Sequence, residues 1–164
     1  LAWLGERLGD VKIVRTMPNT PALVGEGITG VCKNNLVTED EFAYVLKLLS
    51  SFGLAEAIPE SLMDAVVSVS GSSPAYVFLF IEAMADAAVA DGMPRAQAYK
   101  FAAQAVLGSA KMVLETGKHP AELKDMVCSP AGTTIEAVRV LEEKGFRGAV
   151  MDAMKACTAK AKGI

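Results

Sequence analysis

The residues best suited to chemistry form a turn of small and hydroxyl-bearing side chains at residues 129–136, Ser-Pro-Ala-Gly-Thr-Thr-Ile-Glu, which opens directly into an apolar-periodic helix. Such a turn directs several N–H groups and hydroxyls into one small space, and the N-terminus of the following helix carries a partial positive charge. The pattern therefore predicts a receptor for a small anion. Thr133 and Glu136 also fit a capping box, so an ordinary well-capped helix is the alternative interpretation.

Two further segments combine turn-forming and polar residues. Residues 15–22, Arg-Thr-Met-Pro-Asn-Thr-Pro-Ala, close a short predicted strand, and residues 64–76 place a Ser-Gly turn between two apolar helical runs. Pro18 and Asn19 follow a strand end, where open α/β sheets place their ligands. Each segment also has a simpler interpretation, as a Pro-Asn turn whose Asn bonds its own backbone or as an interhelical turn with a Ser cap.

The three segments contain the strings Met-Pro-Asn-Thr-Pro, Ser-Gly-Ser-x-Pro-Ala-Tyr and Ser-Pro-x-Gly-Thr-Thr, in this order. Their order and spacing make the chain similar to the pyrroline-5-carboxylate reductases over essentially its whole length. The resemblance implies an oxidoreductase of proline biosynthesis that reduces 1-pyrroline-5-carboxylate, a cyclic imine, to L-proline with NADPH or NADH. Because the hydride chemistry belongs to the cofactor, the protein residues need not be strong acids or bases.

The resemblance also assigns roles within these segments. Thr134 is the catalytic candidate, because its hydroxyl or an attendant water can reach the ring nitrogen. The candidates for binding the substrate are Glu60, Ser129, Gly132, Thr133 and Thr134. The candidates on the nicotinamide side of the cofactor or lining its crevice are Pro18, Asn19, Ser70, Gly71 and Ser72. For Glu60, at the predicted domain boundary, a solvated hinge carboxylate is the alternative.

Two departures from the family pattern stand out. The family has Gly-Gly after the Pro of the third segment, whereas Ala131 occupies the first of these positions here. If this position requires a positive φ, alanine costs roughly 1 kcal/mol or more. The sequence also lacks the Gly-x-Gly-x-x-Gly turn that holds a cofactor pyrophosphate, and residues 1–8 read as a helix already under way. We therefore expect a truncated, carboxyl-terminal part of the enzyme that is inactive alone.

Composition excludes several classes of function. The 164 residues are 52% hydrophobic but only 6% aromatic, and the formal net charge of −3 leaves no basic surface for nucleic acid. The longest apolar run, residues 74–81, is far short of the ~20 residues that a membrane span needs. Three widely spaced cysteines indicate a reducing compartment, so we expect a cytoplasmic protein, and no spacing suggests a metal site.

The chain divides near residue 60. Before it, strand signals at residues 11–14, 28–32 and 54–58 surround a helix that starts near Thr38. After it, helical signals alone remain, at residues 62–69, 73–91, 95–116, 120–127, 133–143 and from 147 or 148 to 160. The predicted fold is mainly α, with residues 1–60 as the last strands and helix of an α/β Rossmann-type domain and residues 61–164 as an all-helical dimerisation and substrate domain.

The helix at residues 73–91 is apolar on nearly every face, as Val77, Phe78, Leu79, Phe80 and Ile81 show within one and a half turns. A helix that is apolar all round must be covered all round, so a second subunit is expected. The resemblance implies an intertwined homodimer, and a higher oligomer stays open. Two competing functions also stay open: a non-enzymatic helical dimerisation module, and a related dehydrogenase that acts on another small carboxylate.

Overall fold

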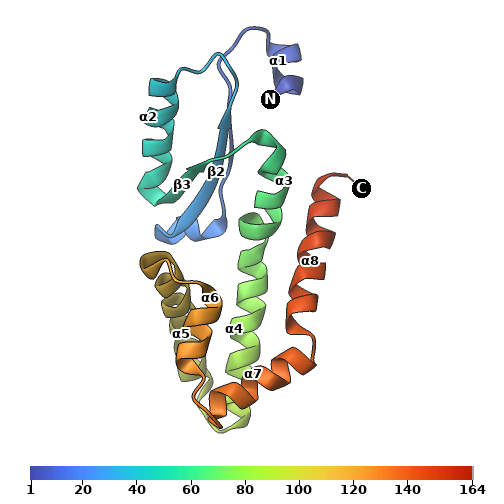
Figure 1. Cartoon of the computed structure of the whole chain (residues 1–164). Coiled ribbons are helices and arrows are strands. Elements are labelled where there is room, and N and C mark those ends of the chain that lie inside the picture. The colour runs from blue at the N-terminus through green and yellow to red at the C-terminus, as the bar shows by residue number, and fades with distance from the viewer. Residues whose placement is uncertain (164) are drawn as a thin grey trace. The chain divides into compact units, whose positions relative to one another are not determined.

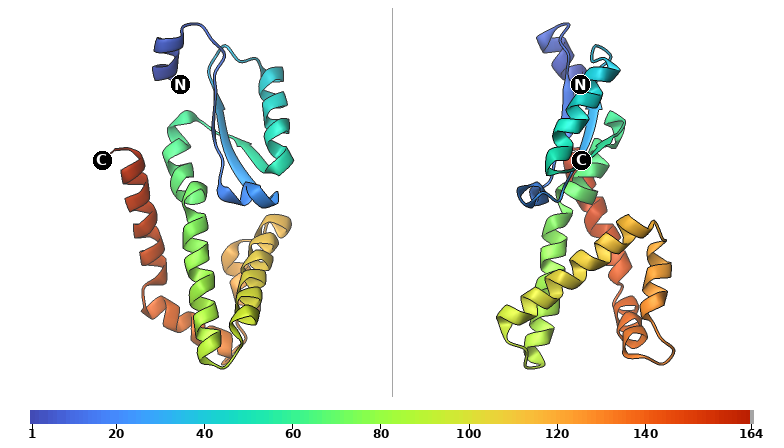
Figure 2. Two further views of the ribbon diagram at one scale, coloured as in Figure 1. Left: turned by 180° about the vertical axis from the view of Figure 1, so that it is seen from behind. Right: turned by 90° about the vertical axis from the view of Figure 1, so that its left-hand side faces the viewer.

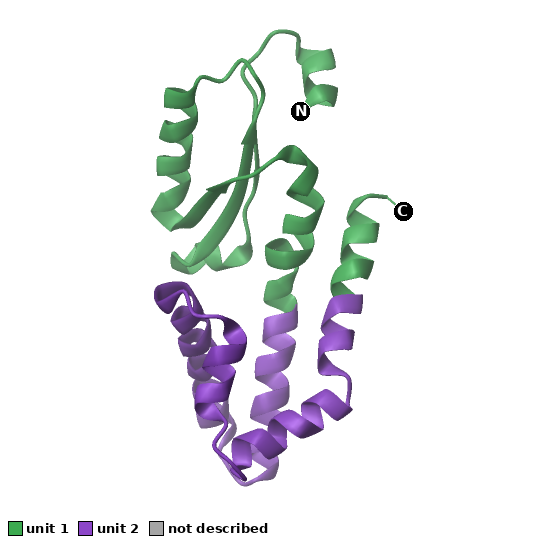
Figure 3. Ribbon diagram, viewed as in Figure 1, with its two compact units in different colours: residues 1–75, 153–164 green, residues 76–152 purple. Residues whose placement is uncertain are grey.

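A computed structural model describes residues 1–163 and shows a mainly helical chain with one small sheet (Figure 1), as the sequence predicts. The chain forms two compact units, one made of residues 1–75 and 153–164 and the other of residues 76–152 (Figure 3). The first unit begins with helix α1 (Ala2–Leu8), and this confirms the helical reading of the first residues. Each unit is described separately below.

The sheet of the first unit has three strands in the order β1-β2-β3, which are β1 (Val14–Met17), β2 (Gly27–Lys33) and β3 (Gly53–Ala57). Strand β1 runs antiparallel to β2, whereas β3 runs parallel to it. Short 3-10 turns, η1 (Thr20–Val24) and η2 (Ser50–Phe52), precede β2 and β3. Helix α2 (Glu39–Leu49) lies along the sheet in every view (Figures 1 and 2). Val31, Val37 and Phe42 form the buried core between them.

The first strand starts three residues later than predicted. Residues 11–13 look like a strand because Val11 and Ile13 flank a polar residue, but the Asn34 side chain provides two of their hydrogen bonds in place of a neighbouring strand. The Asn34 carboxamide oxygen accepts from the Ile13 N–H at 3.1 Å, and its nitrogen donates to the Val11 carbonyl at 2.8 Å. Backbone pairing with β2 begins only at Val14, so the prediction for residues 11–14 is wrong in its boundaries.

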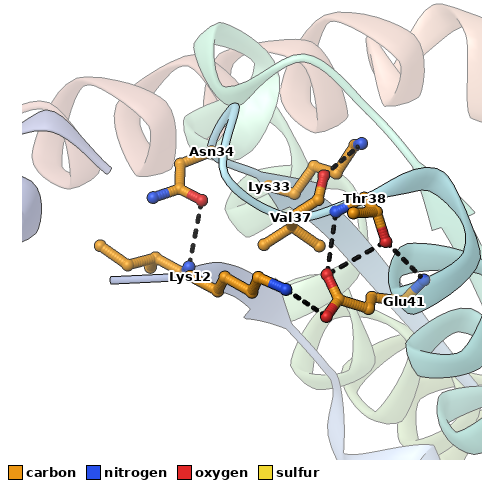
Figure 4. A network of polar contacts seen from close by, with 7 residues as sticks. Lys12, Lys33, Asn34, Val37, Thr38 and Glu41 are labelled. Carbon is orange, nitrogen blue, oxygen red and sulfur yellow. Dashed lines mark hydrogen bonds and ion pairs between the residues drawn. The ribbon is translucent and has the colours of Figure 1, made fainter. Parts of the chain in front are cut away.

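A network of polar contacts fixes the entry into α2 (Figure 4). Thr38 is the N-cap of the helix and forms a complete capping box with Glu41. The Glu41 carboxylate also pairs with Lys12, which joins the start of α2 to the segment before β1. The hydrogen bond from Lys12, with further ones from Thr38, lowers the pKa of Glu41 to about 2. Lys33 donates to the Val37 carbonyl at 2.9 Å and closes the β2–α2 connection.

From Glu60 to Ala90 the chain is one continuous helical segment. It comprises a 3-10 turn (η3, Glu60–Leu62), helix α3 (Met63–Val66), a π-helical turn (η4, Val67–Gly71) and helix α4 (Ser73–Ala90). This segment has 31 residues and a window of mean hydropathy 1.4, so its length and composition would allow it to cross a membrane. The uninterrupted apolar run does end at Ile81, as predicted, but the helix continues past Glu82, so the helical segment is much longer than that run.

The second unit holds the rest of α4, helices α5 (Arg95–Thr116), α6 (Pro120–Val127) and α7 (Thr133–Glu143), and the start of α8 (Phe146–Ala161). These bounds match the predicted helices closely. The buried residues described in this unit are three alanines, Ala85, Ala98 and Ala102. Large apolar side chains are instead exposed, with Phe78 at 62%, Phe101 at 67% and Leu114 at 71%. Three alanines are too little core for a unit of this size, so a partner surface must cover it.

Candidate functional site

Within the first unit, the Asn19 side chain links two of the three sequence motifs. Pro18 follows the last residue of β1, and Asn19 is the N-cap residue of η1. The Asn19 Oδ1 atom accepts from the Ile28 N–H at 2.9 Å, and its Nδ2 donates to the Ser70 carbonyl at 3.2 Å. The side chain therefore bridges the start of β2 and the Ser-Gly-Ser segment rather than bonding its own backbone. The structure brings together the candidate cofactor residues that lie about 50 positions apart.

The Ser-Gly-Ser segment is part of a helix and is not a turn between two helices, so that prediction is wrong. Residues 67–71 form a π-helical turn, closed by a hydrogen bond of 2.8 Å from the Ser72 N–H to the Val67 carbonyl. The extra residue in this turn lets the helix continue into α4 despite Gly71. Such π-helical turns occur frequently at functional sites because they displace part of a helix from its regular spacing.

Gly71 tolerates a side chain without a clash. A Cβ atom at this position would lie 3.8 Å from the Val66 carbonyl and 3.9 Å from the Met17 sulfur, which are ordinary van der Waals contacts. Gly27 differs, because a Cβ there would come within 2.8 Å of Ala22. The fold itself therefore requires a glycine at position 27 but not at position 71. Because glycine has no side chain, Gly71 lets a ligand approach the backbone more closely than another residue would.

A cavity of about 310 Å³ adjoins the bridge made by Asn19. Its lining residues come from β2, from β3 and the residue after it, from the end of α3 and from the π-helical turn, and they are Ile28, Gly30, Glu56, Ile58, Val66, Val69 and Ser70. Two of them, Ile28 and Ser70, are the backbone partners of the Asn19 side chain. An apolar recess with a few polar groups at its edge is the usual form of a site for a small organic molecule.

Glu60 lies at the start of the continuous helical segment and pairs with a cation of its own unit. Its Oε1 atom accepts from the Arg15 guanidinium at 3.0 Å. This ion pair ties β1 to the start of η3.

The third motif lies in the second unit, where Ser129, Pro130, Ala131 and Gly132 form a tight turn. The Gly132 N–H donates to the Ser129 carbonyl at 3.0 Å, and Ala131 has a φ of 55°. Pro at the second position and a positive φ at the third are the features of a type II turn. Ala131 is the one residue other than glycine with a positive φ among those described. The position that is a glycine in the family pattern therefore has a positive φ, and Ala131 adopts this φ here.

The predicted capping box at the start of α7 is wrong. The helix begins at Thr133, so Gly132 is the N-cap residue, and no side chain caps the first amides. Glu136 instead bonds Arg139, whose hydrogen bonds lower the pKa of the Glu136 carboxyl. A Cβ atom at Gly132 would overlap the Ser129 hydroxyl, so glycine is needed to hold that hydroxyl against the helix start. Uncapped amides and nearby hydroxyls suit a carboxylate.

Cys157 is the residue of this site that sequence reasoning missed. Its thiol donates to the Ser72 hydroxyl over 3.2 Å, although the two residues are 85 positions apart. No spacing pattern connects them, because the contact depends on where α8 lies within the first unit. Among the described residues, no group of three His, Cys, Asp or Glu side chains is placed to hold a metal ion.

The fold is thus mainly helical, with one unit that contains a small three-stranded sheet and a second unit that is all helical. The sequence profile of the pyrroline-5-carboxylate reductase dimerisation family matches residues 60–164. The chain belongs to this family, which confirms the resemblance seen in the sequence.

Individual relatives agree with this assignment. A pyrroline-5-carboxylate reductase of Escherichia coli is 69% identical over 98% of this chain, and one of Methanosarcina acetivorans is 50% identical over 96%. The matches span 60% and 58% of those proteins, so the chain is shorter than its relatives. A Plasmodium falciparum pyrroline carboxylate reductase with NADP bound is 38% identical and superposes with a TM-score of 0.91, over 99% of this chain and 66% of that one. The corresponding reductase of Coxiella burnetii is 36% identical, with a TM-score of 0.94 over 99% and 61%.

Proposed function

We propose that this chain is part of a reductase that converts 1-pyrroline-5-carboxylate to L-proline with NADPH or NADH. The observation that carries the proposal is the 69% identity, over 98% of the chain, to a protein named for this activity. The geometry supports it, because Asn19 links two of the shared motifs beside an apolar cavity. A third motif supplies a separate turn suited to a carboxylate.

Nicotinamide cofactors supply the hydride in such a reaction. The residues present fit the nicotinamide end of the cofactor, because an apolar cavity with Ser70 at its edge adjoins the Asn19 bridge. Pro18, Asn19, Ser70 and Ser72 would complete this side of the crevice. The pyrophosphate needs a Gly-x-Gly-x-x-Gly turn, which is not in this sequence. The 164-residue chain alone is therefore proposed to bind NADPH weakly and to be inactive.

The turn at residues 129–134 is proposed to bind the substrate carboxylate. The Ser129 hydroxyl and the uncapped N–H of Thr133 provide the anion site, Gly132 leaves room for that hydroxyl because it has no side chain, and Thr134 donates to, or holds a water at, the ring nitrogen. The positive end of α7 adds to the attraction for the carboxylate. Ala131 adopts its positive φ at a cost of roughly 1 kcal/mol, which the rest of the turn must offset. Glu60 is proposed to accept from the ring N–H, in competition with its ion pair to Arg15.

The second subunit is proposed to be another copy of the same chain. The family is defined by dimerisation, and its profile covers residues 60–164, which include the exposed apolar side chains of α4 and α5. The same surface explains why residues 60–90 have the composition of a membrane span: an apolar helix is covered equally well by a protein partner. The profile's first residue also supports a domain boundary near residue 60. Cytoplasmic location, and the lack of a membrane or nucleic-acid partner, are parts of this proposal.

Two other functions remain distinguishable by experiment. A purely structural dimerisation module would bind neither substrate nor cofactor in the context of the longer protein. A related dehydrogenase would be active on a different small carboxylate. The named activity of several relatives at 50% identity or more favours the reductase over both.

A chimaera tests the proposal directly. Residues 1–163 replace the matching 60% of the Escherichia coli relative, so that the remaining part of that enzyme supplies the rest of the cofactor domain. Oxidation of NADPH on addition of pyrroline-5-carboxylate, with L-proline as the product, is the expected result. A chimaera that folds and binds NADPH but turns over only another imine or keto acid would favour the related dehydrogenase. A folded chimaera without cofactor binding would favour the structural module.

A further inference from the structure

The serine hydroxyls around the π-helical turn do not all have the same role. Those of Ser68, Ser70 and Ser73 each donate to a backbone carbonyl three or four residues earlier in the helix, over distances between 2.8 and 3.1 Å. This is the usual way in which a helical serine satisfies its hydroxyl. The hydroxyl hydrogens of these three serines are therefore already used in hydrogen bonds within the helical segment.

Ser72 is the exception. Its hydroxyl oxygen accepts a hydrogen bond of 3.2 Å from the Cys157 thiol. The geometry assigns the thiol as the donor of this pair and the hydroxyl oxygen as its acceptor. Among the described residues, the Ser72 hydroxyl donates no hydrogen bond of its own. Its hydrogen is thus available to water or to a bound ligand.

We propose that Ser72 is the side chain of the Ser-Gly-Ser segment that donates a hydrogen bond to the nicotinamide cofactor, and that Cys157 is the positioning residue that orients it. This inference rests on the proposed function and identifies which side chain of the predicted cofactor segment donates a hydrogen bond to the cofactor. By occupying one lone pair of Ser72 Oγ, the thiol favours the rotamer in which the hydroxyl hydrogen points away from α8.

The location of the pair supports this role. Ser72 is the next residue after Gly71, whose backbone has no side chain to cover it, and it closes the π-helical turn that Asn19 joins to β2. Both Ser72 and Cys157 are half-buried, so the pair is ordered but not sealed from a ligand. Helix α8 thus contributes to the cofactor side of the site although it contains none of the three sequence motifs.

A double-mutant cycle in the chimaera tests the inference, with NADPH as the probe. Ser72→Ala should raise the Kd for NADPH about 3- to 10-fold, the loss of one ordinary hydrogen bond. Cys157→Ala should raise it about 2- to 4-fold, and the double variant should match Ser72→Ala alone, because Cys157 acts only through Ser72. Cys157→Ser keeps a donor and should restore the Kd to within about twofold, whereas Cys157→Val should behave like Cys157→Ala.

Cys32→Ala is the matched control, because it removes a buried thiol from the same unit without touching Ser72. It should lower Tm but leave the Kd for NADPH unchanged, so a loss of stability alone cannot mimic the effect. Equal effects of Cys157→Ala in the presence and absence of the Ser72 hydroxyl would overturn the inference, as would no effect at all. A chimaera that binds NADPH but lacks the reductase reaction would refute the proposed function, and the inference would fall with it.

Discussion

Replacing Asn19 should reveal how the first unit positions its site. Asn19→Ala removes two hydrogen bonds, to the Ile28 N–H at 2.9 Å and to the Ser70 carbonyl at 3.2 Å. Each is worth about 0.5–1.5 kcal/mol net, and both lie in a half-buried region where water can partly replace them. The expected loss of unfolding free energy is therefore about 1–3 kcal/mol. In a chain of this size, about 2 kcal/mol corresponds to a fall in Tm of about 4–8 °C.

Asn19→Asp separates the two bonds. An aspartate keeps an acceptor for the Ile28 N–H but places a carboxylate oxygen against the Ser70 carbonyl. Amide hydrogen exchange of the chimaera should show Ile28 losing protection in Asn19→Ala and keeping it in Asn19→Asp, while the π-helical turn is loosened in both. Asn35→Ala is the control, since the Asn35 side chain is exposed and should tolerate removal. Unchanged protection of Ile28 in Asn19→Ala, or an unchanged Tm, would refute the bridging role.

Three further changes have outcomes that the structure predicts. Gly71→Ala should leave Tm within about 1 °C but weaken NADPH binding severalfold in titration calorimetry, whereas Gly27→Ala, whose Cβ would lie 2.8 Å from Ala22, should cost about 1–3 kcal/mol in urea denaturation. Glu41→Gln should flatten the dependence of stability on pH: the folded-state pKa of about 2 lies below the ordinary value of 4.5, so the native Glu41 contributes stability above about pH 4.5 that is lost as pH falls toward 2. Urea midpoints measured across this range check the sign, and a steeper slope in Glu41→Gln would contradict it. Phe78→Glu should dissociate or aggregate the dimer in light scattering, because it buries an unpaired charge, whereas Leu48→Glu on α2, which lies outside the dimerisation domain, should not; a dimer of unchanged mass in Phe78→Glu would argue against the α4 interface.

Long elements with strong local signals were predictable from the sequence. Helix α5 has the predicted bounds, because Pro94 and Gly117 mark its two ends. Helix α2 starts where Thr38 and Glu41 form their capping box. The exposed phenylalanines of α4 also agree with the prediction that this helix needs a partner surface. For α2 and α5, the residues that determine where the helix begins or ends lie within or next to the helix itself.

Predictions failed where a distant side chain replaced a local interaction. The Asn34 side chain bonds the Ile13 N–H and the Val11 carbonyl, so the first strand starts late. Gly71 lies in a π-helical turn, whereas local sequence patterns treat a glycine at such a position as a break between helices. Glu136 pairs with Arg139 rather than with the helix start. The contact of Cys157 with Ser72 spans 85 positions and has no local signal at all. Motif order revealed the candidate site, but only the fold shows how Asn19 joins two of its parts.

The most direct test of the central claim is the steady-state kinetics of Thr134 variants in the chimaera. Loss of a hydrogen bond to a charged group costs about 1.5–3 kcal/mol, so Thr134→Ala should lower kcat/KM for pyrroline-5-carboxylate about 10- to 150-fold and leave the KM for NADPH nearly unchanged. Thr134→Ser keeps the hydroxyl and should retain most of the activity. Full activity in Thr134→Ala, or a loss confined to the KM for NADPH, would contradict a substrate site at the start of α7.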